Sequence, residues 1–189
     1  MRDTWVFAAL SDRVMIGQIG ITHGGRPRGL EHDLRAILAR EFYRNSGLMP
    51  HYEVYPRMDL QLPGFDDNPP EYVEIKCAAP VLGTTKEAQG VQSSIVKDIT
   101  KLLKCPDHFR RTFLYFGLYG LAPKRPNRGS PRCEEVRQEI EKIELLAMTT
   151  QSGMTPSPTV RPTAGLVTYV PNTGEQEGRM LYAYWMSWS

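Results

Sequence analysis

Cysteine is scarce in this chain, and its spacing excludes two kinds of stabilised small domain. The three cysteines, Cys77, Cys105 and Cys133, are an odd number and form no CxxC pair. Disulfide frameworks and structural zinc sites depend on paired or closely spaced cysteines, so neither is expected. The four histidines also lack metal-ligand spacing. The fold must therefore be stabilised by its core, and a reducing cytoplasm is the expected compartment.

Long apolar runs and a strong charge of one sign are also missing. The apolar run at residues 6–10 is followed by Ser11-Asp12-Arg13, which makes it too short for the apolar region of a secretion signal. No run approaches the roughly 18 apolar residues of a membrane span, so no membrane association is expected. The formal net charge is only +2. Any affinity for nucleic acid must therefore come from local clusters of basic residues.

The length of 189 residues, with 41% hydrophobic residues, fits one domain with a sizeable core. Residues 149–163 are rich in Ser, Thr, Pro and Gly, and they are the one stretch typical of a linker. We therefore predict a single domain over residues 1–189.

Hydrophobic periodicity predicts helices that alternate with strands. Helices are expected over the apolar stripes at residues 30–42, 88–103 and 133–147. A covered strand is expected at residues 112–119, and hairpins at both ends, formed by residues 5–10 with 14–21 and by residues 165–170 with 180–188. A helix followed by a covered strand indicates a crossover onto the same sheet.

Two stretches of alternating residues carry most of the candidate chemistry. In residues 72–77 Glu74 and Lys76 share one face of a strand, because alternate side chains point to opposite faces. Residues 54–62 alternate in their second half, which contains Asp59. The turn-forming residues at 63–70 predict that the two strands form a hairpin. Asp59 is then expected beside Glu74 and Lys76.

At these residues the chain resembles the PD-(D/E)xK nuclease superfamily, whose fold is that of the restriction endonucleases. The family's motif is an acid on one strand and an acid-x-Lys triplet on the next, matched here by Asp59 and Glu74-Ile75-Lys76. The proline that often directly precedes the first acid is absent, since Pro56 stands three residues earlier. An exposed Glu-x-Lys on a strand is usually a solvated ion pair, so the strand context is the test of the motif.

The resemblance implies an α/β fold with a restriction-endonuclease-like core, a central mixed β-sheet flanked by helices. The family's core is a helix, three strands, a helix and a strand, and it would cover about residues 28–120. The terminal β-hairpins would be additions to this core, with residues 130–189 as a C-terminal elaboration. Residues 51–62 would have to supply two short strands, bent at Pro56.

The resemblance also implies a divalent metal held by Asp59, Glu74 and the backbone carbonyl of Ile75. Mg²⁺ suits such hard oxygen ligands, and Mn²⁺ is the expected substitute. Lys76 would orient or deprotonate the attacking water, or neutralise the phosphate.

Two helical residues extend this candidate catalytic site. Glu31, at the edge of an apolar stripe, matches the acid that many family members carry on the first helix, where it binds metal water or a second ion. An ordinary first-turn glutamate is the alternative, and Asp33 and Glu41 are rivals. Gln92 lies at the stripe edge of the helix after the triplet, where the family often adds a polar residue. Lys97 projects from the opposite side of that helix.

Basic residues in loops are candidates for contact with backbone phosphates, although dispersed solvated arginines look the same in sequence. The candidates are Arg26, Arg28, Arg57, Lys124, Arg125 and Arg128.

Together these features predict a Mg²⁺-dependent endodeoxyribonuclease of restriction, repair or phage-defence type, with DNA as its partner. One alternative is an RNase or toxin nuclease of the same fold. Another is a catalytically inactive nucleic-acid-binding or assembly protein. The C-terminal hairpin is apolar or aromatic on both faces. It is therefore expected either to form a homodimer through one face or to be buried within the monomer against the helix that begins near Ser130.

Overall fold

The computed structural model describes residues 6–8, 10–12, 30–52, 58–77, 81–120, 131–154, 162–169 and 179–188. Its named helices are α3 (Leu30–Ser46), α4 (Lys86–Leu103) and α5 (Pro131–Ser152). Its strands are β1 (His51–Tyr52), β2 (Leu60–Leu62), β3 (Glu71–Cys77), β4 (Arg110–Gly120), β5 (Thr163–Tyr169) and β6 (Arg179–Trp188). The three predicted helices and the covered strand are confirmed, and residues 51–62 do contain two separate short strands.

The strands form one six-stranded mixed sheet in the order β1-β2-β3-β4-β6-β5. β3 and β4 are parallel, and α4 makes the crossover between them, as predicted. The other neighbours are antiparallel, including the β2–β3 and β5–β6 hairpins. The predicted mixed α/β sheet flanked by helices is therefore confirmed.

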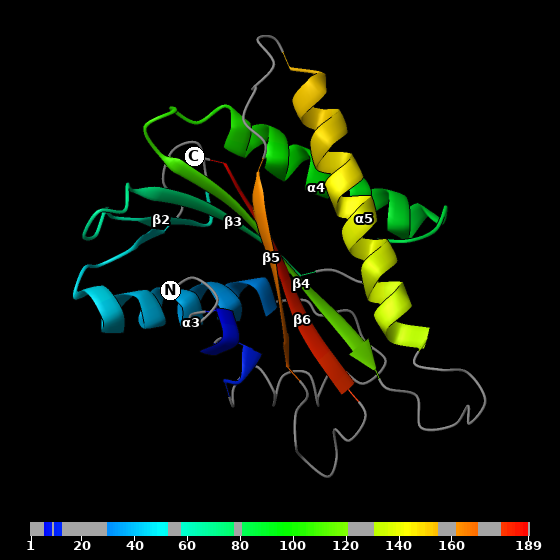
Figure 1. Ribbon diagram of the computed structural model, residues 1–189, viewed down its shortest axis with the longest axis horizontal. Coiled ribbons are helices and arrows are strands. Elements are labelled where there is room, and N and C mark those ends of the chain that lie inside the picture. The colour runs from blue at the N-terminus through cyan, green and yellow to red at the C-terminus, as the bar shows by residue number, and fades with distance from the viewer. Residues whose placement is uncertain are drawn as a thin grey trace.

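Helices cover both faces of this sheet, with α4 and α5 on one face and α3 on the other (Figure 1). Each helix packs through its apolar stripe. On the α3 face the core includes Leu34, Ile37, Phe42, Val73, Ile75 and Leu114. On the α4 and α5 face it includes Ile95, Ile99, Val136, Ile143, Phe113 and Tyr115. No helix in the described parts of the chain is long and apolar enough to cross a membrane.

The predicted N-terminal hairpin is wrong in its first half. Residues 6–8 and 10 are helical, and Val6 and Leu10 are both buried in the core on the α3 face. Residues four apart share a face in a helix and in a strand alike, but a strand would bury Ala8 with them, and Ala8 is only half-buried. The second half, at residues 14–21, lies outside the described residues.

The predicted linker starts too early. α5 continues to Ser152, and within it the hydroxyls of Thr149 and Thr150 donate to the carbonyls of Leu145 and Leu146 one turn before, each at 2.7 Å. Threonine is accepted in a helix when its hydroxyl bonds back in this way. Residues 155–161 lie outside the described part of the chain.

β6 is an inner strand, and the described part of it is covered on both faces. Tyr182, Tyr184 and Trp188 point to α5, where the Tyr184 hydroxyl donates to Glu144 at 2.6 Å. Ala183 lies in the core on the α3 face. Of the two expectations for the C-terminal hairpin, burial against the helix that begins near Ser130 therefore holds for β6. A homodimer, which stays a proposal, would need another surface.

Candidate functional site

The candidate site lies where β2 parts from β3. The antiparallel register ends at the pair Leu60↔Val73. Asp59, the residue before β2, turns its side chain to the edge of β3, and its Oδ2 accepts a hydrogen bond from the Ile75 N–H at 2.8 Å. A short polar side chain competes well for nearby backbone donors, so the carboxylate takes the place of a further ladder bond. We call this place the fork.

The Glu31 carboxylate accepts a hydrogen bond from the next N–H group along the same edge of β3. N–H groups that face one neighbouring strand recur every two residues, so Cys77 follows Ile75 on this edge. The Cys77 N–H donates to Glu31 Oε1 at 2.9 Å. Glu31 belongs to the first turn of α3 and reaches the sheet, as its place at the stripe edge predicted. Its rival Glu41 instead pairs with arginines on the surface of α3.

Glu74 lies on the α4 face of β3, and only 3% of it is exposed. Lys101, in the last turn of α4, forms an ion pair with Glu74 Oε1. Burial raises the pKa of Glu74 to about 8, with a further increase from the Asp59 carboxylate and an opposing effect of Lys101. A buried carboxyl beside a second carboxylate costs stability, and such groups are concentrated at functional sites.

Lys76 is held between two carboxylates. Its Nζ lies 3.1 Å from Glu31 Oε1 and 3.6 Å from Asp98 Oδ2. Burial by itself would lower the pKa of Lys76, but the two carboxylates outweigh it and raise the pKa above its ordinary value. Burial also raises the pKa of Asp98, although Lys76 and Lys101 oppose this. Lys76 is therefore an ammonium ion at neutral pH, and it lies two residues after the buried Glu74 on the same strand.

The oxygen atoms at the fork suit a hard divalent cation. Asp59 and Glu74 are close enough to interact electrostatically, and the Ile75 carbonyl projects from the same edge of β3 as the Ile75 N–H. Among the described residues, no group of three or more His, Cys, Asp or Glu is placed to hold a metal ion by side chains alone. A metal here would thus need the Ile75 carbonyl and waters, which is how proteins usually hold Mg²⁺.

Gln92 is not brought to this site. Its side-chain amide donates to the carbonyl of Val81 at 2.7 Å, so it anchors the connection after β3. The Val81 N–H is bound in turn by Glu139 of α5 at 3.1 Å. Gln92 therefore supports the loop that leaves the site strand.

The site contains three charged residues that the sequence analysis missed, Arg35, Asp98 and Lys101. The apolar stripe of α4, which pointed to Gln92, could equally have pointed to Asp98. At 100° per residue Gln92 lies about 60° to one side of Ile95 and Asp98 about 60° to the other. Periodicity marks both polar edges of the stripe, but it does not say which edge faces β3. Arg35, whose Nη2 lies 3.6 Å from Asp59 Oδ1, gave no such signal.

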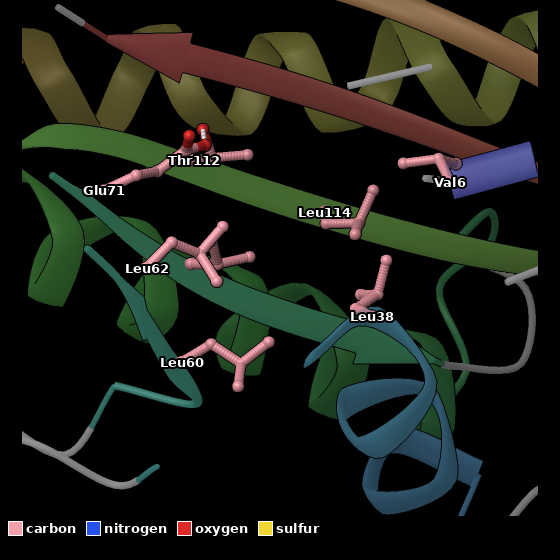
Figure 2. A pocket seen from close by; sticks show the side chains of 8 residues that line it. Val6, Leu38, Leu60, Leu62, Glu71, Thr112 and Leu114 are labelled. Atoms are coloured by element: carbon pink, nitrogen blue, oxygen red, sulfur yellow. Dashed lines mark hydrogen bonds between the residues drawn. The ribbon is translucent and has the colours of Figure 1, made fainter. Parts of the chain in front are cut away.

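A small cavity on the α3 face is separate from this site (Figure 2). Its volume is about 30 Å³, and apolar side chains line most of it. Glu71 and Thr112 close one end, where the Thr112 hydroxyl donates to Glu71 Oε1 at 2.5 Å, and Val6 lies at the other end (Figure 2). A cavity of this size holds no more than a few waters. None of Asp59, Glu74 and Lys76 lines it.

The six residues predicted to contact nucleic acid, Arg26, Arg28, Arg57, Lys124, Arg125 and Arg128, all lie outside the described residues. Comparisons with protein-family models, with curated proteins and with solved structures found no match. The site is therefore interpreted from its own geometry and chemistry.

Proposed function

We propose that this chain is a metal-dependent nuclease of the PD-(D/E)xK superfamily, with a restriction-endonuclease-like core, that hydrolyses phosphodiester bonds of DNA. The observation that carries the proposal is that Asp59 and the face of Glu74 and Lys76 meet at the fork between β2 and β3. The order α3, β1, β2, β3, α4, β4 also follows the helix, three strands, helix and strand of the family's core. An ordinary solvated Glu-x-Lys pair would not have its glutamate buried.

The residues of the fork fit a magnesium site. Asp59 and Glu74 supply anionic oxygens, and the Ile75 carbonyl projects from the same strand edge. When bound, the metal polarises a phosphate oxygen and promotes ionisation of a water molecule. Beyond the last β2–β3 pair, Asp59 and Glu31 accept the hydrogen bonds of the Ile75 and Cys77 N–H groups in place of a strand neighbour.

Lys76 supplies positive charge to the phosphate and does not act as a base. Its ammonium lies within 3.1 and 3.6 Å of two carboxylates, which favour the charged form. The charge stabilises the negative charge that develops on the phosphate in the transition state. Glu31, which was predicted to bind metal water or a second ion, is in this scheme a positioning residue together with Asp98, because both carboxylates hold Lys76.

The test is cleavage of plasmid DNA, single-stranded DNA and RNA, each with Mg²⁺, with Mn²⁺ or with EDTA. We expect wild-type protein and the matched control Lys97→Met, an exposed residue of α4, to cleave DNA only with metal. Glu74→Gln and Lys76→Met should be inactive. Cleavage of RNA alone would favour the RNase alternative. Binding without cleavage of any substrate would favour an inactive nucleic-acid-binding protein.

A further inference from the structure

Lys101 makes an unusual contact for a lysine in the last turn of a helix. Its ammonium pairs with a carboxylate whose side chain is only 4% exposed, while its own side chain is 26% exposed. Lysines at helix C-termini usually point to water, where their charge interacts with the helix dipole. Here the side chain turns inward to Glu74, which the proposed function assigns to the metal.

We propose that Lys101 occupies the place of the metal at Glu74 in the metal-free protein, and that metal binding displaces its ammonium. The inference rests on the proposed function. An ionised carboxylate that is buried beside Asp59 is strongly unfavourable without a cation. In this structure the cation that meets the Glu74 oxygen is the Lys101 ammonium. Lys101 and the metal then compete for the same Glu74 oxygen atoms.

The position of Lys101 allows this exchange. Its flexible stem and partly exposed head can move to solvent without unfolding α4. Asp98, three residues earlier on the same side of the helix, already interacts electrostatically with Lys101 and can receive the ammonium. Lys101 therefore sets metal affinity. It stabilises the empty site, and it makes the metal bind more weakly than the two carboxylates alone would.

The test is calorimetric titration of Mg²⁺ into the wild-type protein and four variants. Lys101→Met removes the charge, and Lys101→Gln removes the charge but keeps a hydrogen-bond donor for Glu74. We expect both to bind Mg²⁺ at least about tenfold more tightly, because a competing charge has been removed from the site. Lys97→Met, with the same change of charge on an exposed part of α4, should bind as wild type does. Glu74→Gln should not bind.

A second measurement uses the unmodified protein, so it does not depend on variants that fold. Acylation of lysines by a water-soluble reagent, read by mass spectrometry, should modify Lys101 faster in Mg²⁺ than in EDTA. Lys97 should react equally in both. Equal reactivity of Lys101 in both conditions would overturn the inference, as would unchanged or weaker Mg²⁺ affinity in both neutral variants. A wild-type protein that binds no Mg²⁺ would instead overturn the proposed function itself.

Discussion

Glu74 occupies a buried position that is unfavourable for an ionised carboxylate. Its pKa is about 8 in the folded protein against 4.5 for an ordinary glutamate, so the folded state binds more protons than the unfolded chain between these two values. The free energy of unfolding must therefore fall as the pH rises through this range. A buried group of this kind is a candidate functional residue, because perturbed pKa values cluster at functional sites.

Glu74→Gln should therefore raise stability while it abolishes nuclease activity. The gain should be absent near pH 4 and complete at pH 9, and it should be on the order of 1.4 kcal/mol for each unit by which the pKa is raised. Urea denaturation at the two pH values measures it. Glu141→Gln, on the exposed surface of α5, is the control and should show no such pH dependence. A Glu74→Gln protein that is less stable than wild type at pH 9 would contradict the assigned burial cost.

Asp59 has two separable tasks, one in the fold and one in the proposed chemistry. Asp59→Asn keeps an oxygen that accepts from the Ile75 N–H, so its stability should stay within about 1 kcal/mol of wild type. Asp59→Ala leaves that N–H without its partner and should cost about 1–3 kcal/mol. Both variants lose an anionic ligand, so both should lose Mg²⁺ affinity and activity. Thermal unfolding and calorimetry separate the two tasks, and unchanged Mg²⁺ affinity in Asp59→Asn would exclude Asp59 as a ligand.

At the residue scale, the sequence allowed prediction of those groups whose direction follows from a strand's alternation. Glu74 and Lys76 share a face because they are two apart, and Asp59 follows from the hairpin. Lys101 was not predictable in this way, because a long flexible side chain reaches a partner that periodicity does not identify. Which cation meets Glu74 depends on how close α4 packs to β3, and that distance is a property of the tertiary structure.

At the scale of elements, α4 shows why a helical stripe was only half informative. The apolar stripe correctly predicted which face of α4 is buried. Each stripe has two polar edges, however, and Gln92 and Asp98 lie on opposite ones. Residues 6–10 show a similar ambiguity, because a run of five apolar residues fits either a strand or a helix. In the structure residues 6–8 and 10 are helical, and Val6 and Leu10 lie in the core on the α3 face.

Separate substitutions of Asp98 and Gln92 test whether Asp98 belongs to the site and Gln92 to the fold. Asp98→Asn removes one of the two charges that hold Lys76 and should lower kcat, because Lys76 is then less well positioned. Gln92→Leu should leave kcat unchanged and cost about 1 kcal/mol of stability, since the Val81 carbonyl loses a hydrogen bond. Steady-state kinetics and urea denaturation of both variants are the measurements. A drop in kcat for Gln92→Leu with unchanged Asp98→Asn kinetics would reverse the two roles.

At the scale of the whole molecule, the strand order could not be derived from the sequence. The C-terminal hairpin was predictable from its two β-favouring runs, but its partner was not. β6 pairs with β4, and the paired residues lie 59 to 77 positions apart in the chain, from Gly120↔Arg179 to Arg111↔Trp188. Local patterns carry no information on such a pairing. The aromatic residues of β6 therefore fitted a subunit interface as well as they fitted a core.

The placement of β6 leads to a definite expectation for a truncated protein. Deletion from Thr163 onward removes an inner strand and uncovers the edge of β4 and the apolar stripe of α5. Tyr182 and Trp188 are both fully buried, and loss of each large buried aromatic side chain costs about 3–5 kcal/mol. The stability of a whole domain is only about 5–15 kcal/mol. The truncated chain should therefore be unfolded.

Circular dichroism and gel filtration of the truncated protein test this expectation, and two point variants keep the chain intact. Trp188→Ala should lower the unfolding temperature strongly, whereas Leu166→Ser should change it little, because Leu166 lies on the edge strand β5 and is 48% exposed. A truncated protein that melts cooperatively as a monomer would contradict the core position of β6. In that case the hairpin would be an attachment to an independent core, and its aromatic face would again be the candidate surface for a homodimer.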